Sequence, residues 1–169
     1  MDMSSTDANE RSMRADATVH DMARVLVTGM SGAGKSTVLD ELRRRGHFAI
    51  DTDYDGWELS EGTWDEPRME RLLADHPDVV VSGTVENQVR FYDRFEHIVL
   101  LSVPIALLLQ RVTDRVNNPY GKALADREEI ARYVEAVEPR LRRGATVELD
   151  GRHPFTELAD DIEHLLSTS

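Results

Sequence analysis

The sequence contains no cysteine, which excludes a disulfide framework and any metal site built from thiolates. Long apolar runs are also missing, because no stretch approaches the roughly 20 residues that a membrane helix requires. The start of the chain lacks the apolar core of a signal peptide. We therefore expect a soluble, cytoplasmic protein that has no membrane partner.

Lysine is almost absent, since only Lys35 and Lys122 occur among the 20 basic residues. The 32 acidic residues give a formal net charge of −12, which disfavours a general affinity for nucleic acid phosphates. A chain of 169 residues can form one domain with one substantial core. We expect a small-molecule partner, and both a monomer and a homodimer remain open.

Residues 1–22 are polar and without hydrophobic periodicity, which predicts a disordered leader. A natural start at Met22 is an open alternative. Residues 23–169 alternate between strand-like and helix-like stretches, which predicts an α/β domain with a parallel sheet covered on both faces. The predicted strands are ARVLVTG, FAIDTD, DVVVSG, HIVLLSV and ATVELD. A core-facing helical stripe is predicted near the end of the chain, at Phe155, Leu158, Ala159, Ile162, Leu165 and Leu166.

The stretch GMSGAGKST, residues 29–37, matches the pattern G-x-x-x-x-G-K-[ST] of a phosphate-binding loop. It lies between a predicted strand and a predicted helix, where small residues let the backbone wrap around phosphates. Lys35 can neutralise the outer phosphates, and the Ser36 hydroxyl can ligate Mg²⁺. The predicted nucleotide-binding residues here are Gly29, Ser31, Gly32, Ala33, Gly34, Lys35, Ser36 and Thr37.

Two aspartates follow the second predicted strand, in the stretch AIDTDYDG. Asp51 can contact Mg²⁺, and Asp53 can accept a proton from a substrate hydroxyl. The alternative is that both simply begin a turn. The third strand ends in Ser82 without an acid at its tip, so the metal needs a carboxylate from elsewhere. Asp51 is the first candidate and Glu86 the second.

Two arginines lie four residues apart on a predicted helix, at Arg111 and Arg115. Side chains with this spacing share one helix face. One guanidinium can pack on a purine while the other contacts phosphoryl oxygens, although two solvated helix residues are the alternative. The following turn-rich stretch, residues 117–127, is typical of a lid that closes over a bound substrate.

These motifs together resemble the adenylate kinase and shikimate kinase group of small P-loop phosphotransferases, over about residues 24–168. The resemblance implies a three-layer α/β/α P-loop fold with a five-stranded parallel sheet in the order 2-3-1-4-5. It also implies ATP and Mg²⁺, with Arg111 on the adenine and Arg115 on the phosphates. The ending LDGRHPFTELADDIEHLL is similar to that of adenylate kinases, which places Asp150 to Pro154, with Arg152, along the base.

The acceptor side is harder to assign. IDTD is similar to shikimate, dephospho-CoA and gluconate kinases, which implies Asp51 near Mg²⁺ and Asp53 near the acceptor hydroxyl. Other candidate substrate contacts come from two polar stretches, and each also has a purely structural interpretation. These candidates are Trp57, Glu86, Asn87 and Arg90.

The leading hypothesis is an ATP-dependent small-molecule kinase in which Lys35, Asp51, Asp53 and Arg115 act in catalysis. It transfers the γ-phosphoryl group to a hydroxyl or a phosphate. The alternative is a P-loop ATPase or nucleotide-dependent switch that acts on a protein partner. The sequence does not identify the acceptor.

Overall fold

The computed structural model describes residues 22–60, 62–114 and 124–167. The predicted leader therefore lies almost entirely outside the described residues, as does most of the predicted lid. Five parallel strands form one sheet in the order β2-β3-β1-β4-β5, which confirms the predicted topology. The strands are β1 (Arg24–Gly29), β2 (Ala49–Asp51), β3 (Val79–Ser82), β4 (His97–Ser102) and β5 (Val147–Asp150).

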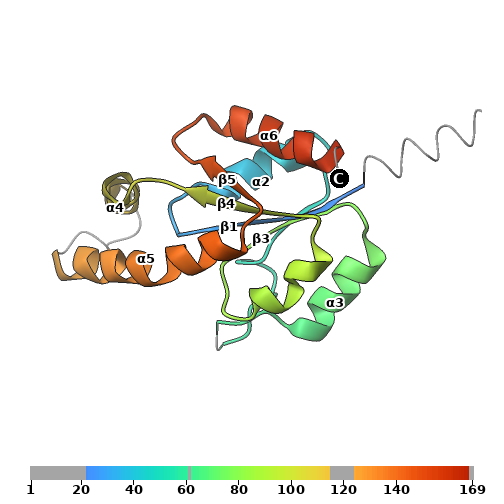
Figure 1. The fold of residues 1–169 in the computed structure, drawn as a ribbon, viewed down its shortest axis with the longest axis horizontal. Helices are drawn as coiled ribbons and strands as arrows, with labels where there is room; N and C mark the ends of the chain where they lie inside the picture. The colour runs from blue at the N-terminus through green and yellow to red at the C-terminus, as the bar shows by residue number, and fades with distance from the viewer. Residues whose placement is uncertain (1–21, 61, 115–123, 168–169) are drawn as a thin grey trace, which may run out of the picture.

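Helices cover both faces of this sheet, as Figure 1 shows. Helices α2 and α6 pack on one face, and α3, η1 and α5 lie on the other. No helix in the described part of the chain is both long and apolar enough to cross a membrane. The helices are α2 (Lys35–Arg44), α3 (Glu66–Asp75), the 3-10 helix η1 (Gln88–Arg94), α4 (Ile105–Asp114), α5 (Leu124–Gly144) and α6 (Phe155–Ser167).

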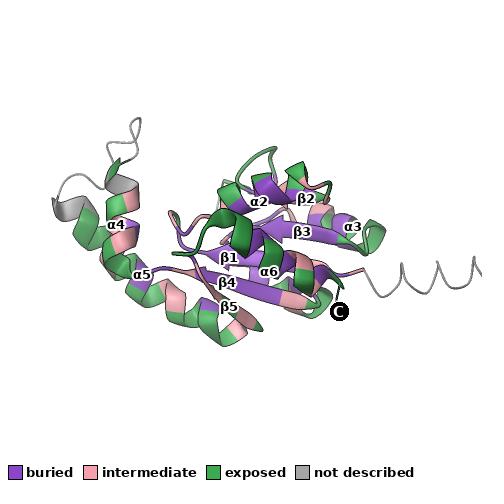
Figure 2. Cartoon of the chain, turned by 90° about the horizontal axis from the view of Figure 1, so that it is seen from above, coloured by how far each residue is buried: buried purple, intermediate pink, exposed green. Residues whose placement is uncertain are grey.

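Burial follows the unbroken apolar runs of the inner strands. Strands β1, β3 and β4 are almost wholly buried, whereas the edge strand β5 is only half-buried (Figure 2). Both faces of an inner parallel strand are covered, so Val, Ile and Leu can occupy successive positions. The predicted α6 stripe is correct for Leu158, Ala159, Ile162 and Leu166, which are buried against α2 and the sheet.

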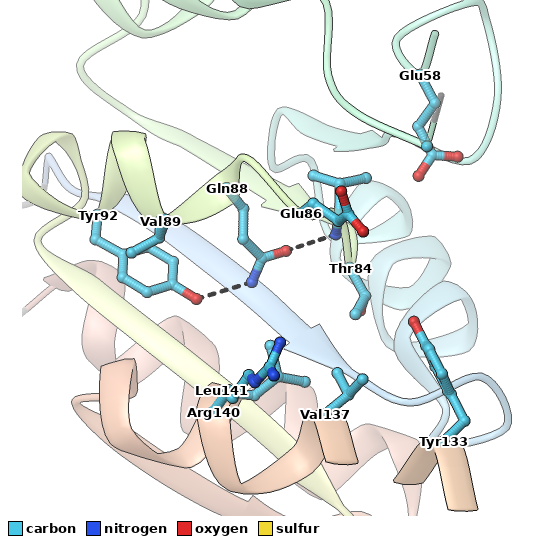
Figure 3. A pocket seen from close by; sticks show the side chains of 12 residues that line it. Glu58, Thr84, Glu86, Gln88, Val89, Tyr92, Tyr133, Val137, Arg140 and Leu141 are labelled. Atoms are coloured by element: carbon cyan, nitrogen blue, oxygen red, sulfur yellow. Dashed lines mark hydrogen bonds between the residues drawn. The ribbon is translucent and has the colours of Figure 1, made fainter. Parts of the chain in front are cut away.

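Phe155 is the exception in that stripe, and its prediction as a core residue was wrong. The residue is 45% exposed and lines a cavity beside the phosphate loop. Phe155 is the first residue of α6, where the helix has only begun to pass over the sheet. A second cavity of about 610 Å³ lies on the opposite side of the sheet, between the segment after β3 and helix α5 (Figure 3).

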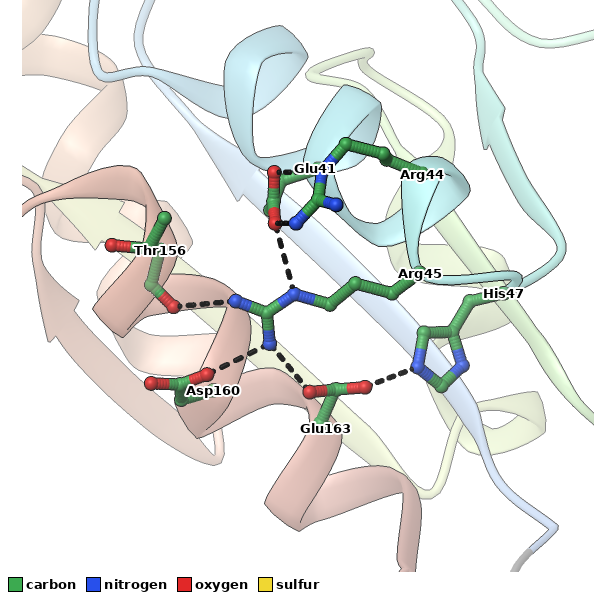
Figure 4. A network of polar contacts seen from close by, with 7 residues as sticks. All are labelled: Glu41, Arg44, Arg45, His47, Thr156, Asp160 and Glu163. Carbon is green, nitrogen blue, oxygen red and sulfur yellow. Dashed lines mark hydrogen bonds and ion pairs between the residues drawn. The ribbon is translucent and has the colours of Figure 1, made fainter.

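An ion-pair network joins the C-terminal end of α2 to α6 (Figure 4). Arg45 contacts Glu41 (3.1 Å), Asp160 (2.7 Å) and Glu163 (2.5 Å). His47 shares a 2.6 Å hydrogen bond with Glu163. Glu41 is 6% exposed, and hydrogen bonds from Arg44 and then Arg45 lower its pKa to about 2.

We expect Glu41→Gln to lower the melting temperature at pH 7 by on the order of 5 °C, because Arg45 loses a charged partner in a nearly buried position. The contribution of Glu41 is fully present above its unfolded pKa of 4.5 and is lost as the pH falls towards 2. The difference in urea midpoint between wild type and variant should therefore be smaller at pH 3 than at pH 7.

The matched control is Asp40→Asn on the same helix, where the side chain is 73% exposed and pairs with Arg43 at 2.9 Å. An exposed pair contributes little, so the melting temperature should change by about 1 °C or less. Equal destabilisation by the two variants, or a pH-independent effect of Glu41→Gln, would contradict the assignment.

Candidate active site

The phosphate loop connects the end of β1 to the start of α2. Gly32 and Gly34 have φ values of 91° and 104°, a backbone region that residues with side chains rarely adopt. A Cβ atom on Gly29 would overlap the carbonyl oxygen of Leu101 in the neighbouring strand β4. The glycines therefore permit both the turn and its close approach to the sheet. Helix α2 begins at Lys35, so its first N–H groups face the loop.

The Lys35 side chain extends from the start of α2 back to the first residues of the phosphate loop. Its Nζ donates hydrogen bonds to the carbonyl oxygens of Gly29 and Met30. These carbonyls hold the ammonium group beside the loop, where a nucleotide phosphate would need a positive charge.

Asp51 joins the end of β2 to the phosphate loop. Ser36 Oγ donates a 2.7 Å hydrogen bond to Asp51 Oδ2, and the Asp53 backbone N–H donates to Asp51 Oδ1 at 3.1 Å. Asp51 is 5% exposed, whereas Asp53 is exposed. The hydrogen bonds from Ser36 and from the Asp53 backbone therefore hold a nearly buried carboxylate beside the phosphate loop.

The tip of β3 lies next to Asp51 in the sheet, where Ser82 is its register partner. Ser82 Oγ is buried and has no hydrogen-bond partner among the described residues. Its carbonyl accepts from both the backbone N–H (3.0 Å) and the hydroxyl (2.7 Å) of Thr52. A Cβ on Gly83 would meet this Thr52 hydroxyl and the ring of Trp64, so glycine is required after Ser82.

A chain of hydrogen bonds leads from the phosphate loop to η1. Thr84 Oγ1 accepts from the Gly29 N–H at 3.3 Å and donates to the Gly29 carbonyl. Thr28 Oγ1 lies 3.3 Å from Thr84 Oγ1 and accepts from Gln88 Nε2 at 3.1 Å. Gln88 Nε2 also donates to the hydroxyl of Tyr92 at 2.9 Å. The side chains after β3 thereby fix the position at which the loop leaves β1.

A cavity of about 360 Å³ separates the phosphate loop from residues 150–154. Arg111 donates to the carbonyls of Gly32 and Gly151, both at 3.0 Å, and so bridges the two loops. Thr37, His153 and Phe155 also line this cavity. Its position beside the loop and its aromatic wall suit a nucleobase.

The loop that follows β5 is held by a local ion pair. Arg152 forms a two-point contact with Asp150, with distances of 3.0 and 2.6 Å to Oδ2, and this contact lowers the Asp150 pKa to about 2. Pro154 directly precedes α6 and accepts the first hydrogen bonds of that helix. The Arg152 side chain is 61% exposed. Its neighbours Gly151 and His153, rather than Arg152 itself, line the cavity.

Three of the predicted acceptor residues have structural contacts. Trp57 is 7% exposed, and the Arg68 guanidinium lies 3.8 Å from its ring centroid. The Asn87 amide accepts from the Trp64 N–H and donates to the Trp64 carbonyl and Glu66. Arg90 forms an exposed 3.1 Å ion pair with Glu66. Glu86 differs, because its side chain lines the 610 Å³ cavity.

That cavity is also lined by Arg140 and by two residues that the sequence interpretation did not assign to the site, Glu58 and Tyr133. Burial and the nearby charges of Asp53 and Asp51 raise the Glu58 pKa, while Lys35 opposes the shift. Glu58 therefore lies near the paired aspartates, although it is five residues beyond Asp53. No local motif marks Glu58 or Tyr133.

Two elements of the prediction cannot be located. Arg115 lies outside the described residues, as do residues 115–123 of the predicted lid. The described part of the chain contains no group of three or more His, Asp or Glu side chains arranged to hold a metal ion. A site with one carboxylate and one hydroxyl remains compatible with Mg²⁺, which keeps several water or phosphate ligands in nucleotide sites.

Comparison with solved structures identifies the fold. Shikimate kinase from Acinetobacter baumannii in complex with shikimate is 21% identical, and the match covers 90% of this chain and 96% of that chain with a TM-score of 0.66. Shikimate kinase from Bacteroides thetaiotaomicron is 21% identical, with 86% and 98% covered and a TM-score of 0.63. A gluconokinase from Sinorhizobium meliloti 1021 is 19% identical, with 86% and 91% covered and a TM-score of 0.59.

These similarities show the three-layer fold of the small P-loop kinases, as predicted. A search of curated proteins found no match. The family model AAA_18, described as an AAA domain, matches residues 25–135, from β1 into α5. The chain therefore belongs to the AAA_18 family of AAA domains.

Proposed function

We propose that this protein is an ATP-dependent kinase that transfers the γ-phosphoryl group to a hydroxyl or phosphate of a small molecule. The observation that carries the proposal is the 2.7 Å hydrogen bond between Ser36 and Asp51. It joins the nucleotide loop to the strand end that also presents Asp53, so a nucleotide site and a potential base lie side by side. The fold shared with shikimate kinase and gluconokinase structures supports the same activity.

The residues beside the loop fit Mg²⁺. Ser36 and Asp51 would hold it, because hydroxyl and carboxylate oxygens are its preferred protein ligands. The buried, unpartnered hydroxyl of Ser82 lies beside Asp51 in the sheet and adds a polar group to this position. When bound, Mg²⁺ neutralises charge on the β- and γ-phosphate oxygens.

For nucleotide binding, we propose that the cavity beside Arg111 takes the adenine and the loop N–H groups take the phosphates. The remaining loop residues and the segment around Arg152 and Pro154 border this site. Lys35 supplies positive charge to the outer phosphates. Arg115 is proposed to contact the transferring phosphoryl group.

In the proposed transfer, Asp53 accepts the proton of the acceptor hydroxyl as that oxygen bonds to the γ-phosphorus. The bond between the γ-phosphorus and the bridging oxygen breaks, and ADP leaves with the electron pair. Asp51 orients the Asp53 backbone by accepting its N–H. The chain's contribution is therefore mainly positioning and charge stabilisation.

The activity is tested by measuring ADP release from ATP and Mg²⁺ with a panel of alcohols, sugars, nucleosides and nucleotides. We expect at least one acceptor to raise the rate well above the rate without acceptor, with a phosphorylated product detected by mass spectrometry. Steady ATP hydrolysis that no acceptor stimulates would instead support an ATPase or a switch that acts on a protein partner.

We expect Lys35→Ala to weaken ATP binding in the presence of Mg²⁺ at least about tenfold, equivalent to about 1.4 kcal/mol. The reason is that the variant lacks the positive charge at the outer phosphates. Isothermal titration calorimetry provides the measurement. Arg94→Ala removes one positive charge from an exposed position on η1 and should leave the affinity within about twofold. Full affinity in Lys35→Ala would contradict the assigned loop.

We expect Asp53→Asn to lower kcat about 100-fold with the acceptor found in the panel, because it removes the proposed base. The affinity for ATP should remain within about threefold. Asp55→Asn is the matched control, since Asp55 is exposed, has a φ of 65° and asparagine tolerates that backbone conformation. A variant at position 53 that keeps more than about a third of the kcat would rule out a base at this position.

A further inference from the structure

The 610 Å³ cavity lies beside the phosphate loop and is formed by three separate parts of the chain (Figure 3). Glu58 comes from the segment between β2 and α3, Glu86 from the turn after β3, and Arg140 from α5. Thr84, another lining residue, is hydrogen-bonded to Gly29 of the loop. A molecule in this cavity would therefore lie next to the bound phosphates, and the volume suits a ligand of monosaccharide size.

Several polar groups in the cavity wall already form hydrogen bonds within the protein. Gln88 Oε1 accepts from the Val85 N–H at 2.9 Å, and its amide nitrogen donates to Thr28 and Tyr92. Gln88 is also 2% exposed. These groups shape the wall, and they have little capacity left to recognise a ligand.

The charged side chains of the cavity wall, unlike these polar groups, are not paired within the described part of the chain. Within the described residues, Glu58, Glu86 and Arg140 form no ion pair and no side-chain hydrogen bond. Arg142, only two residues after Arg140, pairs with Glu138 at 2.9 Å and with Glu148 at 2.8 Å. In Figure 3 the two glutamates lie on one side of the cavity, and Arg140 and Tyr133 extend from α5 on the other. The charges that remain for a ligand are thus two carboxylates and one guanidinium.

The surroundings make the glutamate side more negative. Burial raises the pKa of Glu58, and the negative charges of Asp53 and Asp51 add to this shift. Four carboxylates therefore lie at or beside this wall, and Lys35 is the cation that opposes them at Glu58. A ligand with a positive charge would relieve this repulsion, whereas a carboxylate would add to it.

We propose that the acceptor is a hydroxyl compound that carries a protonated amine, such as an amino sugar or amino alcohol, and that Glu58 and Glu86 bind the ammonium group. This inference rests on the proposed kinase function, because it takes the cavity as the acceptor site. Tyr133 and Val137 supply the less polar wall of the cavity. Glu58 and Glu86 are then the residues that determine specificity, and Asp53 faces the reacting hydroxyl.

The test uses three compounds with the same open six-carbon chain, which differ in charge at one end: glucamine, sorbitol and gluconate. Their binding to the full-length protein with ADP and Mg²⁺ is measured by calorimetry, and phosphoryl transfer from ATP is measured separately by mass spectrometry. We expect glucamine to bind at least about tenfold more tightly than sorbitol, and gluconate to bind most weakly.

Glu58→Gln and Glu86→Gln should each reduce the preference for glucamine over sorbitol at least about threefold, while sorbitol binding stays within about twofold. Glu70→Gln is the control, because Glu70 is an exposed carboxylate on α3 outside the cavity, and it should leave the preference unchanged. Retained sorbitol binding shows that the variants are folded.

The proposal is overturned if gluconate binds more tightly than glucamine, if glucamine does not bind, or if neither glutamate variant changes the preference. Preferred transfer to sorbitol or gluconate overturns the amine specificity while upholding the kinase function. A third outcome is that glucamine binds in a way that depends on the two glutamates, but none of the three compounds is phosphorylated. This result supports the amine site and counts against the kinase function.

Discussion

The parallel pairing of β1 with its neighbours β3 and β4 brings the candidate binding and catalytic residues to one edge of the sheet. Because parallel strands all end on the same side, the phosphate loop, Asp51 and residues 150–154 meet there. The contact is close, since Gly29 lies against the Leu101 carbonyl of β4 and is hydrogen-bonded to Thr84 after β3. The path of the loop, and therefore the position of Lys35, depends on this pairing.

Helix α2 is held firmly at the end that lies away from the loop. Arg45 and His47 bind acidic residues of α6, while the first turn of α2 keeps its backbone N–H groups for a ligand. Both roles are possible in one helix, because the ion pairs at its C-terminal end use side chains and do not involve the backbone N–H groups at its N-terminal end. The ion pairs that hold α2 and the proposed nucleotide site thus use separate parts of one helix.

The two sides of the sheet also differ in how their charges are used. On the α2 and α6 side, carboxylates and guanidinium groups neutralise one another. In the cavity between η1 and α5, Glu58, Glu86 and Arg140 have no such partners within the described residues. Glu86 and Arg140 are exposed and Glu58 is partly exposed, so water solvates these charges and they remain available to a ligand.

Sequence alone predicted the five strands and the phosphate loop, because unbroken apolar runs and a glycine-rich turn are local signals. The order of the strands followed from the resemblance to small P-loop kinases, and the sheet confirms it. Helical periodicity correctly indicated the apolar face of α6 but misplaced Phe155, since periodicity does not show where a neighbouring element ends. The convergence of Glu58, Glu86 and Arg140 was decided only by the tertiary structure. These residues are far apart along the chain, and long-range packing alone brings their charges to one cavity.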